Sequence, residues 1–174
     1  LATVPGGYNN EAAGDYSFAA GINALASHDG SFVMAGATTS GSGSSAANEF
    51  TAHFSGGSRF FSTGNMTVGV SLAPGGSSWS AISDRNAKEN FAEVNAQEVL
   101  DKVVSLPLLT YNLKSQDPSI RHIGPIAQDF YAAFSVGEDD RHITTLDADG
   151  VALAAIQGLN AKLMERDVKL AERD

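Results

Sequence analysis

The chain has 174 residues, 18 glycines, no cysteine and a formal net charge of −9 at pH 7. Without cysteine it has neither disulfides nor thiolate metal sites, and its acidity argues against nucleic acid or an anionic membrane as a partner, because both need a basic face. It has no apolar run long enough to span a bilayer and no secretory signal, and its start at Leu1 predicts a piece of a longer protein.

The composition changes sharply at Ser83. Fourteen of the 18 glycines lie before it, whereas 26 of the 31 Asp, Glu, Lys and Arg residues lie from Ser83 onward. We therefore expect β-solenoid repeats in residues 1–36, a linker and a β-strand stalk in residues 37–82, and an α+β domain with a helical tail in residues 83–174.

The first region contains a repeat at an offset of fourteen. Five identities carry it: Asn9 with Asn23, Ala12 with Ala26, Asp15 with Asp29, Ser17 with Ser31, and Phe18 with Phe32. A short repeat of small residues with Asn or Gly at its turns is typical of a β-solenoid, although two copies leave chance similarity as the alternative. One coil cannot bury its apolar face alone, so neighbouring coils or chains must cover it.

Residues 37–48 are rich in Ser, Gly and Ala and are predicted to form a loop or linker. Alternating apolar residues then predict strands at 49–54 and 66–72, and two phenylalanines mark a third at 59–62. These strands are too short and too rich in glycine to form a core within one chain. Several copies of the chain around a common axis could bury these apolar faces against one another, so a homo-oligomer is predicted.

The charged region from Ser83 onward has the pattern of an α+β domain. A helix is predicted at 96–105, with Val99, Leu100, Val103 and Val104 facing inward, and Pro107 stops it. Residues 108–113 and 142–146 read as strands, and residues 126–134 as a second helix.

A long helix is expected from about Val151. Its seam follows alternating steps of three and four, the spacing of a coiled coil. The seam positions are Ile156, Leu159, Leu163, Arg166 and Leu170, of which only Arg166 is charged and would weaken the seam. Two or three heptads are too short to drive association alone. The alternative is a single amphipathic helix packed on its own domain.

A serine and a lysine five residues apart, Ser83 and Lys88, stand at the composition boundary. A serine hydroxyl is a weak nucleophile unless a base lies beside it. Taken alone, this spacing is more typical of a helix cap followed by a solvated charge.

The surrounding motifs resemble the endosialidase-type intramolecular chaperone, or peptidase S74, domain. Its signature opens with Ser-Asp, has an Arg nearby and places Lys five residues after the Ser, and Ala87 stands where a larger apolar residue is frequent. The similarity covers about residues 83–174 and keeps the order of its motifs, which are 83–91, 99–106 with Pro107 and Tyr111, 121–129, and 146–157.

The resemblance implies a domain that helps three identical fibre or spike chains to assemble and then releases itself by autoproteolysis. Ser83 is the implied nucleophile and Lys88 the general base of a self-cleaving serine endopeptidase that acts once, in cis, at Ile82–Ser83. The Ser83–Asp84 bond is the alternative. A lysine serves as a base near neutral pH only when burial lowers its pKa, and trimer closure would supply that burial.

Four further residues are candidates for supporting roles. Asp84 and Arg85 are expected to orient the turn. His122 and Gln128 lie in a motif of the resemblance, with a packed or capping histidine and a glutamine that satisfies buried backbone as the alternatives. The histidines His28, His53 and His142 have no metal-ligand spacing, so neither a metal nor a cofactor is expected.

The implied partners are two further copies of the chain, the upstream fibre or spike domains of the same chain, and a host-surface receptor. The implied location is a phage tail fibre or spike, with the chaperone part released after assembly, and a bacterial cell surface is the alternative. A different function remains open, in which the chain is a structural trimeric fibre tip or adhesin and Ser83 is inert. A glycan-degrading enzyme finds little support, because no suitable carboxylate pair precedes Ser83.

Overall fold

The computed structural model describes residues 1–37 and 40–173. It forms two compact units, Leu1–Asn90 and Phe91–Asp174. Residues 38 and 39, which belong to the expected linker, lie outside the described residues. Within the described part of the chain, no helix combines the length and apolar character that crossing a bilayer needs.

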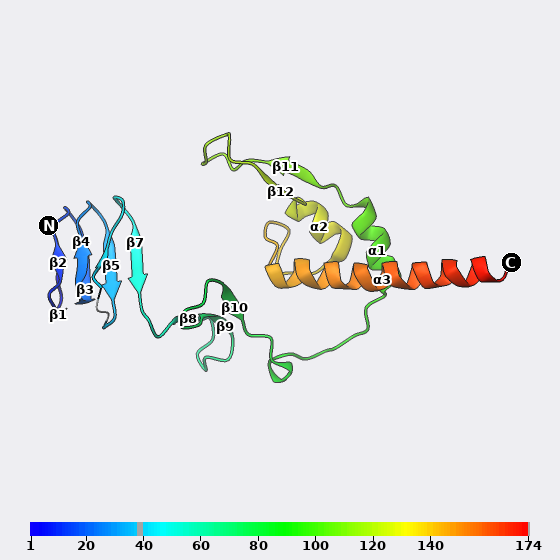
Figure 1. Cartoon of the computed structure of the whole chain (residues 1–174), viewed down its shortest axis with the longest axis horizontal. Helices are drawn as coiled ribbons and strands as arrows, with labels where there is room; N and C mark the ends of the chain where they lie inside the picture. The colour runs from blue at the N-terminus through cyan, green and yellow to red at the C-terminus, as the bar shows by residue number, and fades with distance from the viewer. Residues whose placement is uncertain (38–39, 174) are drawn as a thin grey trace. The chain divides into compact units, whose positions relative to one another are not determined.

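The first unit begins with a β-solenoid made of two parallel sheets (Figure 1). The four-stranded sheet has the order β1 (Gly7–Tyr8), β3 (Phe18–Ile22), β5 (Phe32–Ala35) and β7 (Phe50–His53). The three-stranded sheet has the order β2 (Glu11–Ala12), β4 (Ala24–Ala26) and β6 (Ser42–Gly43). Gly7 pairs with Gly21 and Phe18 with Phe32, so one coil has the length of the fourteen-residue repeat. The predicted β-solenoid is confirmed.

The solenoid continues past residue 36 into the segment that was expected to be a loop. Phe32 pairs with Phe50, eighteen positions further on, and β6 pairs with β4. The Ser/Gly-rich segment can add a coil because its ladder bonds come from the backbone and need no large side chain. Ser42 is buried in this coil, and its hydroxyl contacts Nδ1 of His53.

Small side chains fill the space between the two sheets. The buried hydrophobic cluster is Ala19, Ala24, Ala26, Val33 and Ala35. Two buried serines repeat the same contact one coil apart, because Ser17 donates to the carbonyl of Gly14 and Ser31 to that of His28. The rings of Phe18 and Phe32 stack with centroids 4.1 Å apart, but Phe32 and Phe50 stay exposed. The larger apolar groups therefore lie outside this core.

Gly21 has no room for a side chain. Its φ is +107°, and a Cβ would lie 1.8 Å from the carbonyl oxygen of Ala35 in the next coil. We expect Gly21→Ala to lower the free energy of unfolding by about 2 kcal/mol or more, measured by urea denaturation. Gly56→Ala is the control, because nothing lies within 4 Å of its Cβ position, and it should change stability by less than about 0.5 kcal/mol. Equal midpoints for the two variants would contradict this account of the coil.

A three-stranded antiparallel sheet follows the solenoid in sequence, with the order β10 (Trp79–Ala81), β9 (Gly69–Leu72) and β8 (Ser58–Phe61). The strands expected at 59–62 and 66–72 correspond to β8 and β9, whereas β10 was not expected. β9 begins only at Gly69, because a turn occupies the residues before it. In that turn Met66 has a positive φ of 56°, and the side chain of Asn65 accepts hydrogen bonds from Thr67.

The second unit has an α+β fold with a long C-terminal helix (Figure 1). Its elements are α1 (Ala96–Ser105), the hairpin of β11 (Leu109–Tyr111) and β12 (His122–Gly124), α2 (Ala127–Phe134) and α3 (Thr145–Ala171). The helix predicted at 96–105 is confirmed at both ends. The side chain of Asn95 caps its start by accepting from the amide of Glu98.

Three expectations for the second unit are wrong. Residues 142–146 do not form a strand, and the last helix begins at Thr145 rather than near Val151. Thr144 caps α3 by accepting from the amide of Asp147, and this local contact outweighs the strand propensity of the preceding residues. In α1, Val104 is exposed and does not face inward, whereas Leu100 is buried.

α1 and α3 pack closely at Gly158. A Cβ on Gly158 would lie 2.2 Å from the carbonyl oxygen of Ala96, whereas nothing lies within 4 Å of a Cβ on Gly150 in the same helix. The two glycines therefore provide a matched pair of sites, one that is sterically closed and one that is open.

We expect opposite effects when each glycine is replaced by alanine. Gly158→Ala should destabilise the second unit by about 2 kcal/mol or more, because α1 must move away. Gly150→Ala should stabilise it by up to about 1 kcal/mol through helix propensity. Thermal unfolding followed by circular dichroism measures both, and a stabilising Gly158→Ala would contradict the close packing.

Candidate active site at the end of β10

Ser83 is placed by the antiparallel sheet of the first unit. β10 ends at Ala81, and the amide of Ile82 still donates to the carbonyl oxygen of Gly69 at 3.2 Å. The sheet therefore holds the backbone on the N-terminal side of the Ile82–Ser83 bond, and Ser83 is the first residue beyond this pairing. The Ile82 side chain is 39% exposed.

A single capped turn then brings Lys88 back to Ser83. The turn is the short 3-10 helix η1 (Arg85–Ala87), and its N-cap is Asp84 rather than Ser83. Oδ1 of Asp84 accepts from the backbone amide of Asn86 at 2.9 Å and from its side-chain amide at 3.1 Å. Because Asp84 takes the capping role, the Ser83 hydroxyl is left for another partner.

That partner is Lys88, whose Nζ lies 2.7 Å from Oγ of Ser83 and donates to it. This is the separation that a nucleophile and its base need. Both side chains are exposed in the single chain. For base catalysis the proton in this contact must move the other way, from the hydroxyl to a neutral amine. The fold therefore brings Ser83 and Lys88 into contact, but in the single chain both side chains remain exposed to water.

The turn between β8 and β9 is a part of the site that the sequence analysis did not identify. Asn65 and Thr67 of this turn line a hollow together with Ile82, Asp84 and the last two residues of η1. In the sequence, Gly64-Asn65 is an ordinary turn signal. Nothing in the spacing indicates that the turn lies beside Ser83, because the pairing of β8, β9 and β10 creates that proximity.

His122 and Gln128 belong to the second unit. His122 lies in β12, where Nε2 contacts Oε1 of Gln116 at 2.9 Å and the ring lies tilted against Tyr111. Gln128 lies in the first turn of α2 and lines a separate hollow with Tyr111 and Arg141. Both residues thus have packing or lining positions within their own unit.

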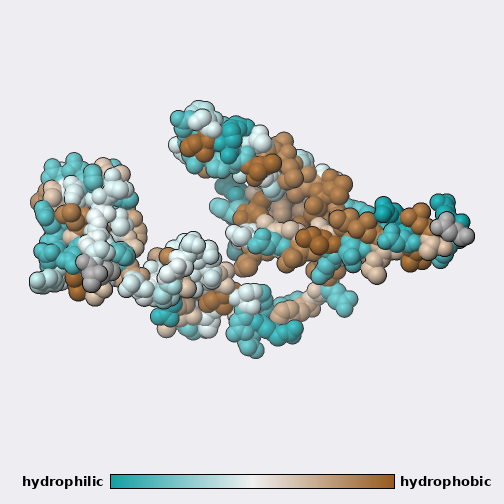
Figure 2. All heavy atoms as spheres, viewed as in Figure 1, coloured by the Kyte–Doolittle hydropathy of each residue, from teal (hydrophilic) through white to brown (hydrophobic). Residues whose placement is uncertain are grey.

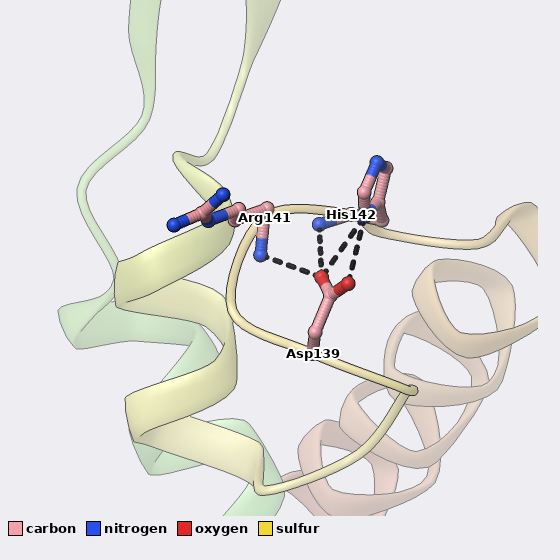
Figure 3. Close-up of polar contacts among 3 residues, drawn as sticks. All are labelled: Asp139, Arg141 and His142. Carbon is pink, nitrogen blue, oxygen red and sulfur yellow. Dashed lines mark hydrogen bonds and ion pairs between the residues drawn. The ribbon is translucent and has the colours of Figure 1, made fainter.

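A second polar cluster, in the loop between α2 and α3, has a structural explanation (Figure 3). The carboxylate of Asp139 accepts from the backbone amides of Arg141 and His142 and from Nδ1 of His142. The Arg141 amide, followed by the His142 side chain, holds the pKa of Asp139 below the ordinary aspartate value. These hydrogen bonds join residues two or three positions apart, so the cluster stabilises the conformation of the loop. Among the described residues, no group of three or more His, Cys, Asp or Glu side chains is placed to hold a metal ion.

The predicted seam residues lie exposed on α3. Ile156, Leu159, Leu163 and Leu170 each leave more than a third of their surface in water. By contrast, Ala155 and Gly158 are buried on the side of α3 that faces α1. Hydrophobic residues are also conspicuous over the helices of this unit in Figure 2. The helix therefore packs on its own unit along one face and leaves a second apolar face uncovered.

Part of the chain matches a known protein family. Residues 83–136 match the model of the peptidase S74 family, described as the chaperone of endosialidase. No curated protein matches the chain significantly. The match begins at Ser83 and covers less than a third of the chain, so the similar stretch noted at 146–157 lies outside it. Residues 83–136 are therefore similar to the peptidase S74 family.

Proposed function

We propose that the region from Ser83 onward is an intramolecular chaperone, which promotes folding and trimerisation of a fibre or spike chain and then releases itself by cutting Ile82–Ser83. The observation that carries the proposal is the 2.7 Å contact between Nζ of Lys88 and Oγ of Ser83 at the first residue of the family match. The family's association with phage tail fibres supports a tail fibre or spike as the location.

In the first step, Oγ of Ser83 attacks the carbonyl carbon of Ile82 through a five-membered ring. The hydroxyl proton passes to the neutral amine of Lys88. The new C–Oγ bond forms, the C–N bond breaks, and the proton goes to the departing nitrogen of Ser83. The peptide has then become an ester.

In the second step, water attacks the same carbonyl carbon. The C–Oγ bond breaks, the serine oxygen regains a proton, and the products are a carboxylate at Ile82 and a free amino terminus at Ser83. General base assistance of this kind is worth about 10²–10⁴-fold in rate.

Assembly supplies the trigger in this proposal. Ser83 and Lys88 are both exposed in the single chain, and a lysine ammonium gives up its proton near neutral pH only when desolvation lowers its pKa. Packing of two further copies around the pair would remove water from it. Cleavage would then follow correct trimerisation and would not precede it.

The exposure of the pair also favours a second candidate function, a structural trimeric fibre tip or adhesin that is never cut. In that case the contact between Ser83 and Lys88 only stabilises the turn. The two candidates share the homotrimer, the upstream fibre domains and a host-surface receptor as proposed partners, and they differ in the fate of one peptide bond.

Intact mass spectrometry of the purified trimer separates the two candidates. We expect the wild-type chain to break at Ile82–Ser83 and Ser83→Ala to stay whole. Lys88→Arg keeps the charge and a hydrogen-bond donor but cannot act as a base, so its cleavage should fall about 10²-fold or more. Ser80→Ala and Lys114→Ala serve as controls and should be cut like wild type. An uncut wild-type trimer would establish the structural role, and cutting between Ser83 and Asp84 would move the scissile bond.

A second prediction tests the coupling to assembly. The double variant Leu159→Glu/Leu163→Glu places charge in the exposed seam and should shift the mass in solution from trimer to monomer, with loss of cleavage. Val168→Glu, at an exposed apolar residue nine positions from Leu159 and therefore on the opposite side of the helix, should do neither. Light scattering and intact mass give the two readouts, and efficient cutting in a monomeric double variant would refute the coupling.

A further inference from the structure

The Ile82–Ser83 bond lies beside a hollow of about 440 Å³, whose lining includes Ile82, Asp84, Asn65 and Thr67. All of these residues belong to the first unit. Since one water takes about 30 Å³ in the liquid, the hollow has room for the water that hydrolyses an ester. Attack on the Ile82 carbonyl carbon moves an electron pair onto its oxygen, and this charge needs a hydrogen-bond donor.

Most of the nearby backbone amides are engaged elsewhere. The amide of Ile82 donates to Gly69, that of Asn86 to the Asp84 side chain, that of Ala87 to the Asp84 carbonyl, and that of Lys88 to the Arg85 carbonyl. The nitrogen of Ser83 is the leaving group and cannot serve as the donor. Most backbone amides that could donate to the oxyanion therefore already make other hydrogen bonds, so a side chain is the better candidate for the donor.

Two side-chain amides line the hollow, and they differ in how far their NH2 groups are engaged. Nδ2 of Asn86 donates to Asp84 at 3.1 Å. In Asn65, Oδ1 accepts from the hydroxyl of Thr67 at 2.7 Å and from its amide at 3.3 Å. These two donors determine which end of the amide is the oxygen. Within the described part of the chain, Nδ2 of Asn65 makes no hydrogen bond, and it is a donor on the wall of the hollow.

We propose that Nδ2 of Asn65 donates to the Ile82 carbonyl oxygen as negative charge develops there, and that Thr67 is a positioning residue that orients this amide. The inference rests on the proposed self-cleavage. The added charge on the oxygen forms with the C–Oγ bond and returns to the carbonyl when the C–N bond breaks, so Asn65 gains and loses no proton. Each passage through a tetrahedral intermediate, in ester formation and in hydrolysis, uses the same donor.

Asn65→Asp is the sharpest test, because it keeps the acceptor for Thr67, removes the donor and places a negative charge where the oxyanion would form. Cleavage followed by intact mass should slow about 10²–10³-fold, the usual loss for one oxyanion donor, while trimer mass and melting temperature stay at wild-type values. Asn95→Asp is the matched control. It makes the same chemical change at the cap of α1, where aspartate caps as well as asparagine, and it should cleave at the wild-type rate.

Hydroxylamine separates the steps, because it traps an ester at Ile82 as a hydroxamate. In Asn65→Asp the trapped product should form as slowly as the cleaved one, since ester formation is itself impaired. Thr67→Val, which lacks the hydroxyl that orients the amide, should fall between wild type and Asn65→Asp. Wild-type cleavage rates in Asn65→Asp would overturn the inference and leave the proposed function intact, whereas an uncut wild type would remove the proposed function itself.

Discussion

Among the described residues, few large apolar side chains are buried within the single chain, and many others stay exposed to solvent. The buried core of the solenoid contains no side chain larger than valine, and in the second unit the buried large groups are Leu100 and Phe130. Exposed phenylalanines and leucines lie on several elements of both units. Exposed apolar surface of this extent is unusual for a monomer and supports the proposed trimer. In the proposed function, folding of one chain is therefore linked to its association with other copies.

The small extent of burial also affects the chemistry proposed for Ser83 and Lys88. A serine and lysine pair works only where water is excluded, and the first unit leaves its pair in solvent. Local structure brings the atoms within 2.7 Å through one capped turn. In the proposed mechanism, removal of water from Ser83 and Lys88 has to come from other copies of the chain. Local structure positions the two side chains and assembly activates them, so an unassembled chain would not cut itself.

Much of the architecture could be predicted, because local patterns govern it. The offset of fourteen equals the coil length because stacked coils pair residues that repeat in sequence. The helix at 96–105 follows from its apolar spacing and from Pro107. The errors arose where a contact two or three residues away decided the outcome. Thr144 caps α3 and converts an expected strand into the start of a helix, and Asp84 takes the capping position that Ser83 would otherwise occupy. The extra coil after residue 36 was missed because serine and glycine carry no apolar pattern.

Residue order alone establishes the repeat, the boundary at Ser83, the spacing of Ser83 and Lys88, and the resemblance that gives this spacing a meaning. These are properties of residue order and need no fold to be read. Three further features became visible only in the folded chain. The turn at Asn65 lies beside Ile82, Gly158 has no room for a methyl group, and the seam of α3 stays uncovered while its other face packs on α1. Each depends on residues far apart in the chain, whose proximity is set by strand pairing and helix packing.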